Sequence, residues 1–413
     1  MNRNVYLEKL IRKKHNGMIK VITGIRRCGK SYLLFNLFNN YLIREGVKED
    51  HIIKLALDDR TNAQYRDPDK LCDYVHSMIL DKDMYYILLD EVQFVNEFED
   101  VLNSFLHIEN ADTYVTGSNA KFLSKDIITE FRGRGDQIHL FPLSFSEFMQ
   151  DNPMEMEQAW QDYLLFGGLP QILGMKSKRD KQDFLKDLFS QVYVKDILER
   201  NDVRNPDEME ELLSYLASAV GGLTNQKKLS DTFKSVKGKS IHPETIKNYL
   251  DLFEDSFLIS KANRYDIKGR KYISTPAKYY FVDTGLRNAC LNFRQYEESH
   301  LMENVIYNEL LIRGYSVDVG VVDYNYYSDD QRIYKKLEID FVCNLGSNRI
   351  YIQSALAMSN EDKEKQEQLS LQNVDDNFKK MIIVKDIPTH FNQNGILIYN
   401  LFDFLTDSEA LDR

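Results

Sequence analysis

Residues 18–31 contain the feature that most constrains how this chain folds. The run MIKVIT is typical of a short buried strand, and it leads into GIRRCGKS, after which YLLFNLFNNYLI has the pattern of a helix. The spacing GxxxxGK[ST] between a strand and a helix predicts a phosphate-binding loop (Walker A), because its backbone N–H groups curl around a phosphate. Lys30 is expected to reach the β- and γ-phosphate oxygens, and Ser31 to bind Mg²⁺. The residues predicted to contact the nucleotide are Gly24, Ile25, Arg26, Arg27, Cys28, Gly29, Lys30, Ser31 and Tyr32.

An acidic pair follows a second apolar run and predicts the rest of the catalytic centre (Walker B). Residues 85–89 read YYILL and are followed directly by Asp90 and Glu91. We expect Asp90 to hold Mg²⁺ through water and Glu91 to polarise the attacking water. Glu91 matters most for function, because it separates a hydrolase from a protein that only binds nucleotide.

Further apolar runs at 51–57, 113–117 and 137–141 alternate with helical stretches, which predicts a parallel α/β sheet. The run at 113–117 ends in TGSN, so Ser118 or Asn119 is a candidate γ-phosphate sensor, with a plain turn as the alternative. Arg132 and Arg134 are the candidate arginine fingers, acting within the chain or from a neighbouring copy. A solvated arginine pair is the alternative for these two.

Cys28 lies beside Lys30 at the expected start of a helix, a setting that lowers the pKa of a thiol. The sequence therefore suggests that catalysis is sensitive to thiol reagents. The alternative is that Cys28 is a small spacer shielded by nucleotide.

The order of these motifs resembles a widespread family of bacterial and archaeal AAA-type (AAA+) ATPases. The resemblance rests on GIRRCGKS, LLDEVQ, TGSN, FRGRG, PLSFSEF and GGLP, and it covers nearly the whole chain. It implies ATP and Mg²⁺ as cofactors, hydrolysis of ATP to ADP and phosphate, and a C-terminal domain of unknown function with a restriction-endonuclease-like core. The expected fold is α/β throughout, with an AAA+-like ATPase domain at 1–165, a helical linker and winged helix at 166–290, and the endonuclease-like domain at 291–413.

The middle of the chain predicts helices followed by a hairpin. Helical patterns near 226–234 and 243–253 precede FLISKANRYDIKGRKYIST, which reads as two strands joined by a tight turn. This order suggests a winged helix. Its basic residues could contact DNA phosphates, but acidic residues share the same face, which favours docking of a protein over contact with DNA. The basic residues concerned are Lys247, Lys261, Arg264, Lys268, Arg270 and Lys271.

The C-terminal third resembles a nuclease core that has lost its metal site. Glu303, Glu338 and Asp340 are available as carboxylates, but Gln353 stands where a second carboxylate is needed and Ala355 where the lysine is needed. We therefore do not expect nuclease activity. The alternative is that Lys335 or Lys336 takes over the lysine's role.

Composition narrows the class of protein further. The net charge of −11 argues against a chain coated for nucleic-acid binding, and no apolar run approaches the length of a membrane span. Four scattered cysteines suit a reducing cytoplasm. We expect a cytoplasmic, nucleotide-driven switch or machine that acts on a protein partner or DNA, with homo-oligomerisation left open. An ATP-regulated DNA-binding protein or nuclease and a signalling scaffold are the alternatives.

Overall fold

The computed structural model describes residues 2–117, 133–150, 154–201, 203–238, 241–328, 331–392 and 394–411. Contacts divide the chain into two compact units. The N-terminal unit is Met1–Leu143 with two short segments, Leu169–Gln171 and Asp255–Phe257, and the remaining residues form the C-terminal unit. The division into three domains stays a prediction, since the contacts group most of 166–290 with 291–413 in one unit.

A parallel sheet of five strands forms the centre of the N-terminal unit, in the order β2-β3-β4-β1-β5. All four pairings between its neighbouring strands are parallel, so the carboxyl ends of the strands share one edge. This confirms the predicted P-loop α/β sheet. The strands are β1 (Ile19–Thr23), β2 (Ile52–Ala56), β3 (Tyr85–Asp90), β4 (Ala111–Thr116) and β5 (Gly135–His139).

Helices bury apolar faces against this sheet, as Phe98, Val101, Leu102 and Phe105 of α5 do at helical spacing. The helix after the phosphate-binding loop starts as α2 and continues through a π-helical segment, η1, into α3. The helical segments are α1 (Asn4–Arg12), α2 (Lys30–Tyr32), η1 (Leu33–Phe38), α3 (Asn39–Arg44), η2 (Glu49–His51), η3 (Arg60–Arg66), α4 (Pro68–Met78), η4 (Val92–Phe94) and α5 (Phe98–Phe105).

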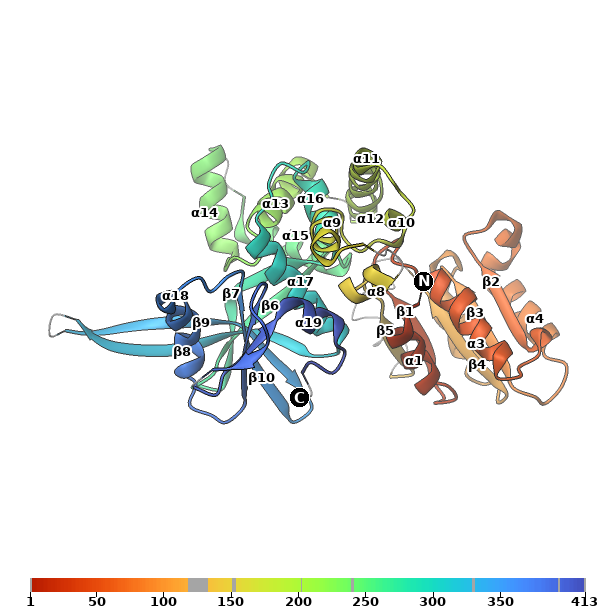
Figure 1. Cartoon of the computed structure of the whole chain (residues 1–413). Coiled ribbons are helices and arrows are strands. Elements are labelled where there is room, and N and C mark those ends of the chain that lie inside the picture. The colour runs from red at the N-terminus through yellow and green to blue at the C-terminus, as the bar shows by residue number, and fades with distance from the viewer. Residues whose placement is uncertain are drawn as a thin grey trace. The chain divides into compact units, whose positions relative to one another are not determined.

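The C-terminal unit combines a helical region with a mixed sheet (Figure 1). The helical patterns predicted near 226–234 and 243–253 are confirmed as α14 and α15. Among the described residues, no helix is both long and apolar enough to cross a bilayer. The helical segments after residue 143 are α8 (Phe145–Gln150), α9 (Met156–Phe166), α10 (Pro170–Leu173), α11 (Lys178–Leu188), η5 (Phe189–Val194), α12 (Lys195–Arg200), α13 (Pro206–Ser218), α14 (Gln226–Lys237), α15 (Pro243–Asp255), α16 (Thr284–Cys290), α17 (Glu298–Ile312), α18 (Glu361–Gln372) and α19 (Leu401–Thr406).

The sheet of the C-terminal unit has eight strands in the order β12-β13-β11-β10-β9-β8-β6-β7. Strands β8 and β9 continue beyond their neighbours as a long two-stranded arm (Figure 1). The strands are β6 (Ile259–Asp266), β7 (Lys271–Phe281), β8 (Ser316–Ser328), β9 (Gln331–Leu345), β10 (Asn348–Ala355), β11 (Lys379–Val384), β12 (His390–Phe391) and β13 (Leu397–Asn400).

The hairpin predicted as the wing of a winged helix exists as β6 and β7, but it is built into this sheet. Strand β6 pairs in parallel with β8, where Arg264 lies opposite Val319. The basic hairpin is therefore continuous with the C-terminal strands and does not stand free as a wing.

Candidate functional site

The phosphate-binding loop follows β1 at the carboxyl edge of the sheet and depends on its glycines. A Cβ atom placed on Gly24, whose φ is +145°, would lie 2.2 Å from the carbonyl oxygen of Leu140 and 3.1 Å from Sγ of Cys28. Gly29 has a φ of 102°, and Arg27 is also left-handed with a φ of 64°. These torsions curl the backbone tightly between β1 and α2, as a phosphate cradle requires.

Lys30 begins α2 and directs its ammonium group back into the loop. Its Nζ donates to the carbonyl oxygens of Gly24 and Ile25, both at 3.0 Å, and the residue is 4% exposed. Both partners of the ammonium within the described part of the chain are neutral carbonyls, which a phosphate oxygen can replace as a stronger acceptor.

Asp90 ends β3 and is buried beside the loop. Its carboxylate accepts a hydrogen bond from the hydroxyl of Thr116, and it is also hydrogen-bonded to the side chain of Ser31. Burial raises the pKa of Asp90, and the bonds to Thr116 and Ser31 oppose this shift. The structure therefore joins the two predicted metal ligands, Ser31 and Asp90, in one hydrogen-bonded group.

Glu91 lies next to this group in a left-handed conformation, with a φ of 54°. Its backbone N–H donates to Thr116 Oγ1 at 3.0 Å, and its carboxylate accepts from the side-chain amide of Gln93. Thr116 therefore bonds to both acidic residues, and Gln93 holds the carboxylate of the second. Neither role was predicted from the sequence, although Gln93 lies within LLDEVQ and Thr116 begins TGSN.

His139 is a further residue near the loop that the sequence analysis missed. It ends β5, where its Nδ1 lies 3.2 Å from Thr23 Oγ1, and its ring packs on Phe141 and Phe257. Burial, together with the charge of Lys30, lowers the pKa of His139 to about 3. The imidazole is therefore neutral beside the phosphate-binding loop at physiological pH.

Arg134 lies at the opposite edge of the sheet. Its carbonyl oxygen accepts from Ile19 N at 2.9 Å, at the start of β1, whereas the loop follows the end of that strand. A five-residue strand separates the two edges, about 16 Å. The expectation that Arg134 completes the site within its own chain is therefore wrong; a role toward a neighbouring copy stays a prediction. Ser118, Asn119 and Arg132 lie outside the described residues.

The remaining residues of the loop differ in exposure. Ile25 and Cys28 are buried, so their side chains pack into the protein, whereas Arg27 and Tyr32 are exposed. Burial raises the pKa of the Cys28 thiol, and the nearby charge of Lys30 only partly opposes this. The expectation that Cys28 is a reactive thiolate is therefore wrong, because burial outweighs the effect of the helix start.

A second polar centre lies in the C-terminal unit around Lys278, a residue of β7. Its Nζ lies 2.8 Å from Glu303 Oε1, 2.8 Å from Glu338 Oε1 and 3.2 Å from Asp340 Oδ1. The three carboxylates that the sequence offered thus converge, but on a lysine that it did not single out. We call Lys278, Glu303, Glu338 and Asp340 the Lys278 cluster.

Lys335 and Lys336 do not take the missing lysine's role. Both are exposed on the arm of β8 and β9, where they lie opposite Tyr324 and Asp323. The available signal for Lys278 was its place two residues before Tyr280 within the apolar run of residues 277–282, which puts both side chains on one face of β7. Tyr280 indeed donates its hydroxyl to Glu303 Oε1 at 2.6 Å.

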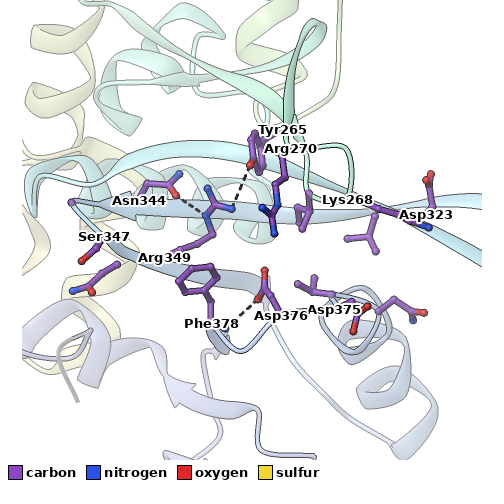
Figure 2. A pocket seen from close by; sticks show the side chains of 16 residues that line it. Tyr265, Lys268, Arg270, Asp323, Asn344, Ser347, Arg349, Asp375, Asp376 and Phe378 are labelled. Carbon is purple, nitrogen blue, oxygen red and sulfur yellow. Dashed lines mark hydrogen bonds between the residues drawn. The ribbon is translucent and has the colours of Figure 1, made fainter.

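A cavity of about 740 Å³ lies elsewhere in the C-terminal unit (Figure 2). Lys268 and Arg270 line it from the turn between β6 and β7, and Asp375 and Asp376 line the opposite side. The guanidinium of Arg349 packs on the rings of Tyr265 and Phe378, with its centre 4.9 and 5.6 Å from the two ring centres. The cavity can therefore offer cations, carboxylates and aromatic faces to a ligand.

Comparisons with known proteins match both parts of the chain. Residues 16–149 match the family described as AAA domain, and residues 157–297 match a domain of unknown function. An uncharacterized protein of Haemophilus influenzae is 32% identical over 411 residues, which are 98% of each chain. An uncharacterized protein of Methanocaldococcus jannaschii is 28% identical over 382 residues, 89% of this chain and 80% of that protein.

Two solved structures show a weaker similarity. The Aeropyrum pernix ORC1 protein in complex with DNA is 10% identical with a TM-score of 0.28, covering 70% of this chain and 92% of that one. The Caenorhabditis elegans protein PCH-2 is 16% identical with a TM-score of 0.26, covering 61% of this chain and 65% of that one. Scores this low carry no argument about function.

Proposed function

Because this chain belongs to a family of AAA-type P-loop ATPases, we propose that it binds Mg·ATP at residues 24–32 and hydrolyses it to drive a conformational switch. The observation that carries this proposal is the position of the Lys30 ammonium, which is bonded to carbonyls of the loop. The neighbouring bond between Ser31 and Asp90 and the adjacent Glu91 complete the set of groups that phosphoryl transfer needs.

The residues of the loop fit a nucleotide and its metal. A side chain at Gly24 would collide with the carbonyl of Leu140 and disturb the loop, and both Ser31 and Asp90 offer the oxygen ligands that Mg²⁺ prefers. When bound, Mg²⁺ neutralises charge on the phosphate oxygens. Ser31 and Asp90 would hold it, and Lys30 would leave the loop carbonyls to bind phosphate oxygens.

Glu91 is the proposed residue that orients the attacking water. Its left-handed backbone is fixed by the bond from its N–H to Thr116, and its carboxylate is fixed by Gln93. Holding both ends of the residue limits the positions its carboxylate can take, which favours catalysis through pre-organisation.

A neighbouring copy of the chain would complete the site if arginine fingers take part. Arg134 lies at the edge of the sheet opposite the phosphate-binding loop of its own chain. Only the Arg134 of another copy could therefore reach the nucleotide. Assembly of copies on ATP is therefore part of the proposal, and size measurements of Glu91→Gln with and without ATP test it.

The activity test compares Mg²⁺-dependent ATP hydrolysis by the wild type, Lys30→Ala and Glu91→Gln. We expect Glu91→Gln to lower kcat by at least about 100-fold while nucleotide affinity changes little, and Lys30→Ala to lose productive binding. Glu97→Gln is the matched control, because it removes the same charge from an exposed position in the same unit. Normal turnover by Glu91→Gln would remove the assigned base.

An ATP-regulated nucleic-acid binder is the second candidate function. It is favoured by Lys268, Arg270 and Arg349, which meet at the cavity of the C-terminal unit. Repeating the ATPase measurement with single- and double-stranded DNA and RNA separates the two: stimulation that falls with salt and is lost in Lys268→Ala with Arg270→Ala supports nucleic acid. Turnover without stimulation points to a protein partner.

A further inference from the structure

We propose that the ammonium of Lys278 is the permanent cation of the Lys278 cluster and that it excludes a divalent metal from the point where the three carboxylates meet. An endonuclease-like core implies Mg²⁺ at such a point, so the proposal separates this unit from metal-dependent phosphodiester cleavage. It concerns the C-terminal unit alone and is independent of the proposed ATPase.

The ammonium lies among three carboxylates, from Glu303 on α17 and from Glu338 and Asp340 on β9, at 2.8, 2.8 and 3.2 Å. It donates hydrogen bonds to Glu303 and Asp340 and forms an ion pair with Glu338. The side chain of Lys278 is only 4% exposed. A buried charge of this kind is stable only when it is paired and hydrogen-bonded, and here the ammonium has three ion-pair partners, two of which accept its hydrogen bonds.

Three carboxylate oxygens of the Lys278 cluster already accept hydrogen bonds. Asp340 Oδ1 faces Lys278, and Asp340 Oδ2 accepts from the backbone N–H of Ser354 at 2.9 Å. Glu303 Oε1 accepts from both Lys278 and the hydroxyl of Tyr280. A divalent metal would have to displace these donors from both carboxylates.

The neighbouring residue Gln353 adds no charge that would favour a metal. Its amide oxygen lies 3.3 Å from the N–H of Asp340, and its amide nitrogen lies 3.5 Å from Glu367 Oε2. A neutral amide here adds no negative charge to the three carboxylates, while the ammonium adds a positive charge. The donor set therefore does not fit a resident divalent cation.

Electrostatics keep the lysine charged. Burial acts to lower the pKa of Lys278, but Tyr280 and the carboxylates of Glu303, Asp340 and Glu338 raise it well above its ordinary value. Burial raises the pKa of Glu303, which its bond to Lys278 opposes. The carboxylates thus favour the charged ammonium, which would repel a divalent cation at this short range.

The proposal is tested by Mn²⁺ binding to nucleotide-free full-length protein, in an Asp90→Asn background that removes the carboxylate ligand of the nucleotide site. We expect no Mn²⁺ at the Lys278 cluster of this parent. Lys278→Met frees three carboxylates and should create one Mn²⁺ site per chain, with affinity raised at least about tenfold. Adding Glu303→Gln to Lys278→Met should remove that site.

Lys385→Met is the matched control. Lys385 is also largely buried, and its Nζ bridges Glu157 Oε1 at 2.7 Å and Glu298 Oε1 at 2.8 Å. If Lys278→Met gains no more Mn²⁺ affinity than Lys385→Met, the proposal is wrong. If Lys278→Met does not fold, Mn²⁺ binding by the parent is compared with binding by the parent that also carries Glu303→Gln. Mn²⁺ that the parent binds and the Glu303→Gln variant does not bind would overturn the proposal. Equal Mn²⁺ binding by the two proteins supports it.

Discussion

The hydroxyl of Thr116, the last residue of β4, donates its hydrogen to the carboxylate of Asp90, the last residue of β3. The same hydroxyl oxygen accepts the N–H of Glu91, so one side chain sets the position of both acidic residues. Hydrogen bonds to charged groups contribute about 1.5–3 kcal/mol.

Thr116→Val keeps the shape of the side chain and removes these bonds. We expect kcat for ATP hydrolysis to fall by about 10- to 100-fold, because Asp90 and Glu91 lose a shared anchor. Thr113→Val is the control, since Thr113 is buried in the same strand. Equal kcat values in the two variants would contradict the assigned role of Thr116.

Gly24→Ala should destabilise the N-terminal unit by about 3 kcal/mol and abolish nucleotide binding, because the new Cβ would overlap the carbonyl of Leu140. Gly46→Ala separates this overlap from backbone strain: Gly46 also has a positive φ, +89°, but a Cβ there meets nothing within 4 Å. Gly46→Ala should cost about 1 kcal/mol and leave nucleotide binding intact. Thermal unfolding and titration with a fluorescent ATP analogue measure both effects.

The stability of the C-terminal unit should depend on pH through Asp283. Burial raises the pKa of this carboxyl from 3.8 to about 6, although N–H groups of Gly168 and Leu286 donate to it. The folded protein therefore binds more protons than the unfolded chain between these values. The contribution of Asp283 to the free energy of unfolding should be fully present below pH ~4 and should fall by about 3 kcal/mol as pH rises through ~6.

Urea unfolding of the wild type and Asp283→Asn across this pH range measures the contribution. The slope to compare is that of the free energy of unfolding against pH. The difference between the two proteins in this slope is due to Asp283, because the other titrating groups are common to both. Asp207→Asn, at an exposed position in the same unit, should keep the wild-type slope. A wild-type slope in Asp283→Asn would show that this carboxyl titrates normally.

Thiol reagents should leave ATP hydrolysis unchanged, even without nucleotide. Cys28 is fully buried and burial raises the pKa of its thiol, so little thiolate is available to react. Cys72 is only partly buried and should be alkylated first, as peptide mass spectrometry can establish. Alkylation of Cys28 in the folded apo protein, with loss of activity, would contradict this.

The parts of the site that the sequence predicted are contiguous in the chain. The phosphate-binding loop is one short segment, and so is the pair Asp90 and Glu91. The spacing of residues within each segment was therefore enough to predict its chemical role. Thr116 acts through strand order, because β4 lies beside β3, and no spacing in the sequence reports that neighbour. The error at Arg134 has the same origin, since its edge of the sheet depends on the direction in which β5 runs.

The Lys278 cluster was harder to predict from the sequence than the role of Thr116. Lys278 meets Glu303 and Asp340 across 25 and 62 positions of the chain, and neither separation belongs to a recognised pattern. The hairpin that carries Lys278 was interpreted from its local turn as a wing, whereas its pairing with β8 is a long-range property.

That pairing has a consequence for dissecting the protein. A fragment that starts at residue 291 would lack β6 and β7, leaving backbone N–H and C=O groups of β8 unpaired from Val319 to Val321 and three acidic side chains without their ammonium. Such a piece should aggregate on expression. A cut after Leu143 keeps the eight strands and the Lys278 cluster together. Residues 144–413 are therefore best expressed, exchanged between relatives or crystallised as a single module.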